Sequence, residues 1–156
     1  MRMYVHQEGK HEADAIDAAD TDVLAAALEI GSGDGLLVLI EDRDQVLDIT
    51  LTVEDAGGTD RMHVFRGRRS RIEVVVSFNG ERREREFATS ARVDRVFHWA
   101  TGEHGFGLSK ADAAEHTLAL TGSNVIPAGD VHIGSLDQQT PGQVAFSLIP
   151  KHRYEG

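Results

Sequence analysis

The chain has 156 residues, no cysteine and a formal net charge of −10 at pH 7. Without cysteine it forms no disulfide or thiolate metal site and has no cysteine nucleophile. No apolar run approaches the roughly 20 residues of a membrane helix, and the first ten residues lack the apolar stretch of a signal peptide. We therefore expect a cytoplasmic protein that does not insert into a membrane.

The charge is unevenly distributed along the chain. Residues 1–66 carry five Lys and Arg against fifteen Asp and Glu, whereas residues 67–156 carry eleven of each. Phosphate repulsion by the acidic first half argues against nucleic acid as a partner. The basic run from Arg66 to Arg71 has no interleaved aromatic residues for base stacking, so we interpret it as a solvated linker.

The second half of the sequence predicts a β-hairpin. Apolar residues alternate over 72–78, which directs one face of a strand toward a core. Asn79-Gly80 follows, a pair that favours the positive φ angles of a tight two-residue turn. The returning segment 81–87 is charged on both faces, which is typical of an edge strand that avoids further pairing.

A helix is predicted after this hairpin. Apolar residues recur at i, i+3, i+4 and i+7 between 93 and 100. Thr89 or Ser90 is positioned to cap the helix, and Gly102 stands where a left-handed residue would end it. Two further strands are predicted beyond the helix, over 116–122 and 143–149.

The first half repeats this order. Strands are predicted over 1–7, 10–16, 35–42 and 61–67. The segment 21–31 has the pattern of a helix with a capping residue at its start and a glycine at its end. An internal repeat of this size favours two small domains over one mixed domain.

A hairpin, a crossing helix and a later strand beside the first strand form the β-grasp arrangement, with a right-handed crossover. The sequence therefore predicts an α+β fold of two tandem β-grasp (ubiquitin-like) domains, each a mixed sheet with one crossing helix. The expected domains are 1–67 and 72–150, with a basic linker at 68–71 and a flexible C-terminal tail at 151–156.

At the level of element order, nearly the whole chain resembles tandem ubiquitin-like modifiers. The Asn79-Gly80 hairpin, the helix at 91–100, the run 118–136 and a last strand leading into a basic tail carry the similarity. Two fused ubiquitin-like domains that finish on a glycine are similar to the interferon-induced tandem modifier of animals. They are more similar to the bacterial BilA-type modifiers of anti-phage conjugation operons.

The resemblance implies a chemistry for Gly156. A ubiquitin-activating-like enzyme would adenylate its carboxylate with ATP, and a ubiquitin-conjugating-like enzyme would pass it to a lysine of a target such as a phage structural protein. A JAMM-type peptidase would trim the precursor or reverse the bond. Ubiquitin ends in two glycines after an arginine, whereas in this chain a single terminal glycine, Gly156, follows Tyr154 and Glu155. The tail that would reach the partner enzymes consists of Lys151, His152, Arg153, Tyr154 and Glu155.

Neither a catalytic residue nor a cofactor is expected in the chain itself. None of the eight histidines has a recognised ligand spacing, and Ala15 replaces the second histidine of a His-Glu-x-x-His pattern at His11. The glycine-rich segment 31–35 follows the first predicted helix and lacks the Lys-Ser/Thr of a phosphate-binding loop. We therefore expect no metal site and no enzyme activity.

Two surface features have alternative interpretations. Val75 and Ile149 should face away from the core, where they form a partner patch or pack on the neighbouring domain or loops. The arginines of 81–87 either steer an acidic enzyme or pair with the glutamates beside them. Two other functions stay open, a tandem β-grasp binding module that is never conjugated and an accessory subunit of an enzyme complex.

Overall fold

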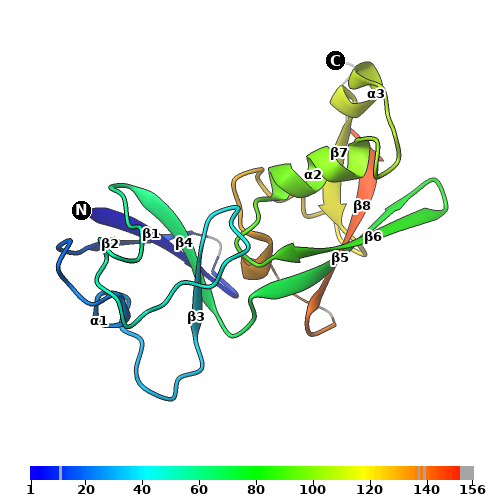
Figure 1. Cartoon of the computed structure of the whole chain (residues 1–156). Helices are drawn as coiled ribbons and strands as arrows, with labels where there is room; N and C mark the ends of the chain where they lie inside the picture. The colour runs from blue at the N-terminus through cyan, green and yellow to red at the C-terminus, as the bar shows by residue number, and fades with distance from the viewer. Residues whose placement is uncertain (11, 137, 139, 152–156) are drawn as a thin grey trace.

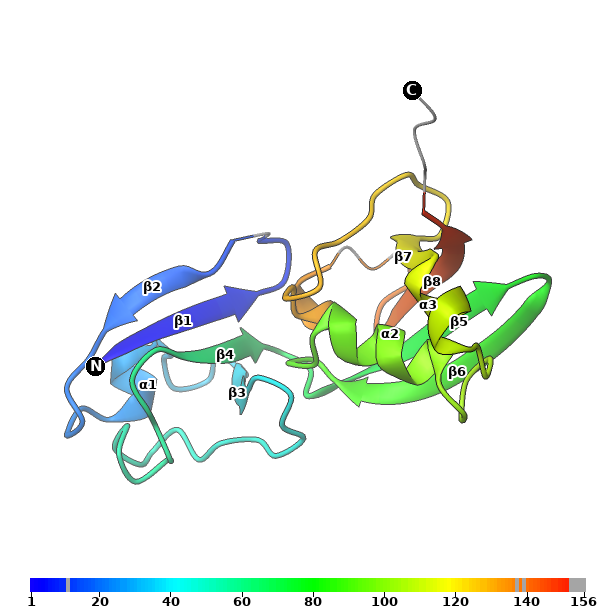
Figure 2. The same ribbon diagram turned by 90° about the horizontal axis from the view of Figure 1, so that it is seen from above.

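The computed structural model describes residues 1–10, 12–136, 138 and 140–151. It contains two four-stranded mixed sheets, one from each half of the chain, which lie side by side (Figure 1). The view from above shows the chain passing from β4 of the first sheet directly into β5 of the second (Figure 2). This confirms the predicted fold of two tandem β-grasp domains.

The N-terminal domain has the strand order β2-β1-β4-β3. Its first strand, β1, pairs antiparallel with β2 and parallel with β4. The last strand of the domain therefore lies beside the first, as predicted. Met3 and Val5 of β1 are fully buried in its core together with Leu28. The elements are β1 (Arg2–Gln7), β2 (Asp14–Asp17), α1 (Leu24–Ala27), β3 (Leu37–Ile40) and β4 (Met62–Gly67).

The first helix is much shorter than the predicted segment 21–31. It has four residues, and Glu29 follows it in the left-handed region at φ 54°. No side chain caps its N-terminus. The N–H groups of Leu24 and Ala25 instead donate to the carbonyl oxygens of Leu51 and Ile49 at 2.8 and 2.9 Å. Backbone carbonyls of the segment between β3 and β4 thus accept the N–H groups at the start of α1, where the sequence predicted a capping side chain close in the chain.

The C-terminal domain repeats this topology with the order β6-β5-β8-β7. β5 and β8 are parallel neighbours, and α2 lies across the sheet (Figure 1). Asn79 and Gly80 have φ angles of 50° and 79°, which confirms the predicted tight turn. The elements are β5 (Arg71–Phe78), β6 (Glu81–Ala88), α2 (Val93–Thr101), α3 (Lys110–Ala114), β7 (His116–Leu120), the 3-10 helix η1 (Ile133–Ser135) and β8 (Gln143–Pro150).

The predicted ends of α2 are wrong in detail. Its N-cap residue is Arg92, and neither Thr89 nor Ser90 caps it. Both are buried instead, with the Thr89 hydroxyl donating to Arg69 O at 2.9 Å and the Ser90 hydroxyl to Arg43 O at 3.0 Å. Gly102 has a φ of −82°, so the helix ends without a left-handed residue.

Another short helix was not predicted. α3 has five residues and lies between α2 and β7, where no element was predicted. Ser109 is its N-cap residue, and the Ser109 hydroxyl accepts the Asp112 N–H at 3.1 Å. None of the helices in the described residues combines the length and apolar character that crossing a bilayer requires.

Candidate functional site

The base of the C-terminal tail is held in the sheet. β8 runs between β5 and β7, and its last residue, Pro150, pairs with His116. The Lys151 N–H then donates to Glu115 O at 2.8 Å, so the first residue of the predicted tail is anchored. The other four residues of the predicted tail, His152, Arg153, Tyr154 and Glu155, lie outside the described residues. So does Gly156, the predicted conjugation residue.

A small hollow adjoins the base of the tail. Its volume is about 180 Å³, and Lys151 lines it together with residues of α2 and β7. Phe97 and Leu118 contribute apolar surface, while Asp94 and His116 contribute polar groups. The base of the tail therefore lies beside α2 and β7 at this hollow.

The two alternatives for Val75 and Ile149 are a partner patch and packing within the molecule. Both residues lie on the sheet face opposite the core residues Val74 and Leu148. Val75 is only 4% exposed, which favours packing within the molecule, whereas Ile149 is half-buried. Val75 has a strand partner on each side, Glu84 and Ala145, whereas Ile149 lies beyond the β5–β8 pairing and has only Thr117 opposite it. This leaves Ile149 as the more accessible member of the pair.

The arginines of β6 pair with acidic residues. Arg82 lies 3.1 Å from Glu84, and Arg83 lies 3.4 Å from Glu81. Glu86 pairs in turn with Arg71 of β5. These contacts support the interpretation of β6 as a solvated edge strand.

The two domains meet through Asp42, which follows β3. Its carboxylate accepts the backbone N–H of Arg92 at 2.9 Å and the guanidinium Nε–H at 2.7 Å. The Asp42 N–H donates to Ser90 O at 3.1 Å, and Arg95 donates to Asp42 O at 2.9 Å. Asp42 of one domain thus accepts the N–H of the N-cap residue of the helix in the other. The first-turn N–H groups of Val93 and Asp94 donate to Val131 O and Gly129 O. The Asp42 carboxylate also holds the pKa of Arg92 above its ordinary value.

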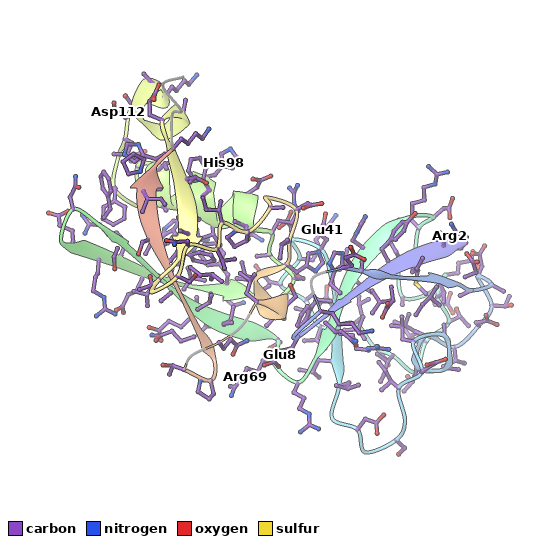
Figure 3. All side chains as sticks on the ribbon, turned by 180° about the vertical axis from the view of Figure 1, so that it is seen from behind. Arg2, Glu8, Glu41, Arg69, His98 and Asp112 are labelled. Carbon is purple, nitrogen blue, oxygen red and sulfur yellow. The ribbon has the colours of Figure 1, made fainter. Side chains whose placement is uncertain are left out.

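Three histidines and a glutamate converge beside this contact. His6 Nε2 lies 2.9 Å from His63 Nδ1, and His132 Nε2 lies 2.8 Å from Glu41 Oε2. The rings of His6 and His132 stack with centroids 3.7 Å apart. His132 comes from the C-terminal domain, and the other three come from the N-terminal domain. Glu41 lies between the two sheets (Figure 3). We call these four residues the junction cluster.

Burial keeps two of these imidazoles neutral. It lowers the pKa of His132 to about 4, and the nearby His63 lowers it further. It likewise lowers the pKa of His6 to about 4, with His132 and His63 contributing. His132 has no exposed side-chain surface, and its Nδ1 has no hydrogen-bond partner among the described residues. A neutral ring that donates from Nε2 leaves Nδ1 as the unpaired acceptor.

Sequence spacing did not reveal the junction cluster. His6 and His63 are separated by 57 positions and His132 and Glu41 by 91, so no local motif contains them. The one usable signal was the parallel pairing predicted for the first and last strands of the N-terminal domain, which carry His6 and His63. That pairing is observed, with Tyr4 opposite His63 and His6 opposite Phe65.

Comparison with known proteins places this architecture in a family. A family model described as BilA ubiquitin-like domain 2 matches residues 73–151, just over half of the chain. No curated protein sequence matches the chain significantly. The matched segment contains most of the second sheet, both of its helices and Lys151 at the base of the tail. With its two ubiquitin-like sheets, the chain belongs to the BilA family of ubiquitin-like proteins.

Proposed function

We propose that this protein is a ubiquitin-like modifier that becomes joined to target proteins through the carboxylate of Gly156. An activating enzyme would transfer AMP from ATP to this carboxylate and release pyrophosphate. An enzyme thiol would then displace AMP to form a thioester. The amine of a target lysine would finally displace the thiol and form an amide bond.

The observation that carries this proposal is the family match over residues 73–151. The matched domain leads directly into the tail, which leaves the sheet through an inner strand. Because glycine has no side chain, its carbonyl carbon is unhindered toward an attacking nucleophile. Lys151 and Arg153 add positive charge that favours an acidic enzyme surface.

In this proposal the chain is a substrate of other enzymes rather than an enzyme. Its partners would be an activating enzyme, a conjugating enzyme and a metal-dependent JAMM-type peptidase that reverses the bond. Its targets would be phage structural proteins, in bacterial anti-phage defence. The hollow beside Lys151 offers the activating enzyme a contact next to the tail.

The test is a reaction of the purified full chain with ATP and a candidate activating enzyme from the same genome. We expect an adduct that survives denaturation and is cleaved by a thiol reductant. A chain lacking Gly156 should form none, whereas the exposed-histidine variant His98→Ala should react like the unaltered chain. A binding module would instead keep its partner after the tail is removed. No adduct with the unaltered chain, or an equal adduct without Gly156, would overturn the proposal.

A further inference from the structure

Three metal-ligand atoms of the N-terminal domain converge at the junction. They are His6 Nε2, His63 Nδ1 and a carboxylate oxygen of Glu41, and they lie within 4.8 Å of one another. The separation is 2.9 Å between the two imidazole nitrogens and 4.0 Å between His63 Nδ1 and Glu41 Oε2. The three side chains come from β1, β4 and the residue after β3, which are parts of one sheet.

The ring and backbone contacts around these atoms hold them in place. Tyr4 stacks on the His63 ring with centroids 4.8 Å apart, and His132 stacks on the His6 ring. The Glu41 N–H donates to His63 O at 3.0 Å, which ties the end of β3 to β4. A site formed on paired strands needs little rearrangement before it binds a ligand.

Two residues of the C-terminal domain orient the Glu41 carboxylate. His132 Nε2 lies 2.8 Å from Oε2 at hydrogen-bond distance, and Arg92 Nε lies 3.7 Å from Oε1 as an ion pair. A hydrogen bond such as that from His132 holds the ligating carboxylates of metal sites in position. Glu41 and His63 are 26% and 42% exposed at their side chains, so an ion can reach the site from solvent.

We propose that His6 Nε2, His63 Nδ1 and the Glu41 carboxylate bind one divalent transition-metal ion of the Zn²⁺ class, with His132 positioning the carboxylate. Two imidazoles and a carboxylate form a donor set that suits Zn²⁺. Metal–ligand bonds of about 2.0–2.2 Å separate tetrahedral ligands by roughly 3.3–3.5 Å. The two imidazole nitrogens would therefore move apart by a few tenths of an ångström. His63 Nδ1 and the Glu41 oxygen would approach each other by a similar amount.

The ion would take the place of the hydrogen bond between His6 Nε2 and His63 Nδ1. The proton that lies between the two rings in the metal-free protein would move to the other nitrogen of the same ring. Each neutral imidazole would then bind the ion with one nitrogen and carry its single proton on the nitrogen that faces away from the ion. A water molecule would complete the coordination. Because His132 and Arg92 of the C-terminal domain hold Glu41, the bound ion would also strengthen the contact between the domains.

The test is calorimetric titration of metal-free, tag-free full chain with Zn²⁺, together with Co²⁺ absorption spectroscopy. We expect one Zn²⁺ per chain and a Co²⁺ spectrum of a four- or five-coordinate site. His63→Ala should abolish the site. His132→Ala, which removes no ligand but removes both the hydrogen bond to Glu41 and the stack on the His6 ring, should weaken the affinity by about 10–100-fold. The matched control His98→Ala removes an exposed histidine of α2 (Figure 3) and should bind like the unaltered chain.

Two results would overturn the proposal. One is the absence of saturable one-to-one binding to the unaltered chain. The other is equal binding by the His63→Ala and His98→Ala variants, which would attribute the ion to scattered surface histidines. Glu41→Gln provides a second test should His63→Ala fail to fold, because it keeps an acceptor for His132 while removing the charge. Its affinity should fall at least 10-fold, and unchanged affinity would also contradict the site.

Discussion

The Asp42 carboxylate accepts two hydrogen bonds from Arg92, one from its backbone N–H and one from its guanidinium. Arg92 is the N-cap residue of α2, and no side chain of its own domain caps that helix. The N-cap residue of the principal helix of the C-terminal domain is therefore held by a residue of the N-terminal domain, while Val131 O and Gly129 O accept the N–H groups of the first turn. This relationship couples the stability of the two domains.

Replacing Asp42 by Ala should destabilise the protein by about 1–3 kcal/mol, because the acceptor for the Arg92 N–H and a charge-assisted hydrogen bond to its guanidinium are lost together. The measurement is the free energy of unfolding in urea. Asp44→Ala, at an exposed position of the same loop, is the control and should stay within about 0.5 kcal/mol. Equal effects of the two substitutions would show that Asp42 does not stabilise the junction.

Adding a methyl group at Gly134 should disturb the packing between the domains. A Cβ at this position would lie 2.6 Å from Phe65 Cζ and 2.8 Å from Thr89 Cβ. Gly134→Ala should cost about 1–3 kcal/mol, the range for an overpacked core. Phe65→Leu removes the ring that is in the way, so the double variant should lose less stability than the sum of the single variants. Additive effects in this double-mutant cycle would contradict the contact.

The metal-free protein should become less stable as the pH falls from about 6.5 toward 4. The folded pKa of His132 and His6 is about 4, below the ordinary value of 6.5, so the unfolded chain binds protons that the folded chain does not. The loss is on the order of 3 kcal/mol for the fully buried His132, with a smaller addition from the half-buried His6, and it is complete below the folded pKa. The charged and titratable groups that act on these rings are Glu41, Asp42, His63, Arg92 and Asp130.

Urea unfolding at several pH values in the presence of a chelator checks this dependence. His132→Gln keeps a donor for Glu41 and removes one titrating group, so its stability should change less steeply between pH 6.5 and 5. His98→Ala should keep the full slope. A flat profile for the unaltered chain would show that the two rings protonate without cost in the folded state.

Two neighbouring arginines of β6, Arg82 and Arg83, should contribute differently to the stability of the folded protein. Arg82 makes an ion pair with Glu84 and has a side chain 62% exposed. Arg83 also lies 4.8 Å from the Phe106 ring centroid and donates to Gly105 O at 3.3 Å. Arg83→Ala should therefore cost about 1 kcal/mol, whereas Arg82→Ala should cost less than about 0.5 kcal/mol. Thermal unfolding measures both, and the reverse order would contradict the cation–π contact.

Local patterns account for the parts of the fold that were predicted correctly. Alternating apolar residues determine which face of β5 is buried, and Asn79-Gly80 determines where the hairpin turns. The helical spacing of Val93, Val96 and Ala100 predicts the buried face of α2. Each of these signals lies within one element, so it is readable before the chain has folded.

The order of the strands and helices, and with it the tandem β-grasp fold, follows from local sequence patterns. Folding of the whole chain sets the ends of α1 and α2, the burial of Val75 and the grouping of His6, Glu41, His63 and His132. These features depend on partners from distant segments, such as the backbone of Leu51 for α1 and Asp42 for α2. A sequence pattern reports local periodicity and turn chemistry. It does not report which side chains two folded domains bring together.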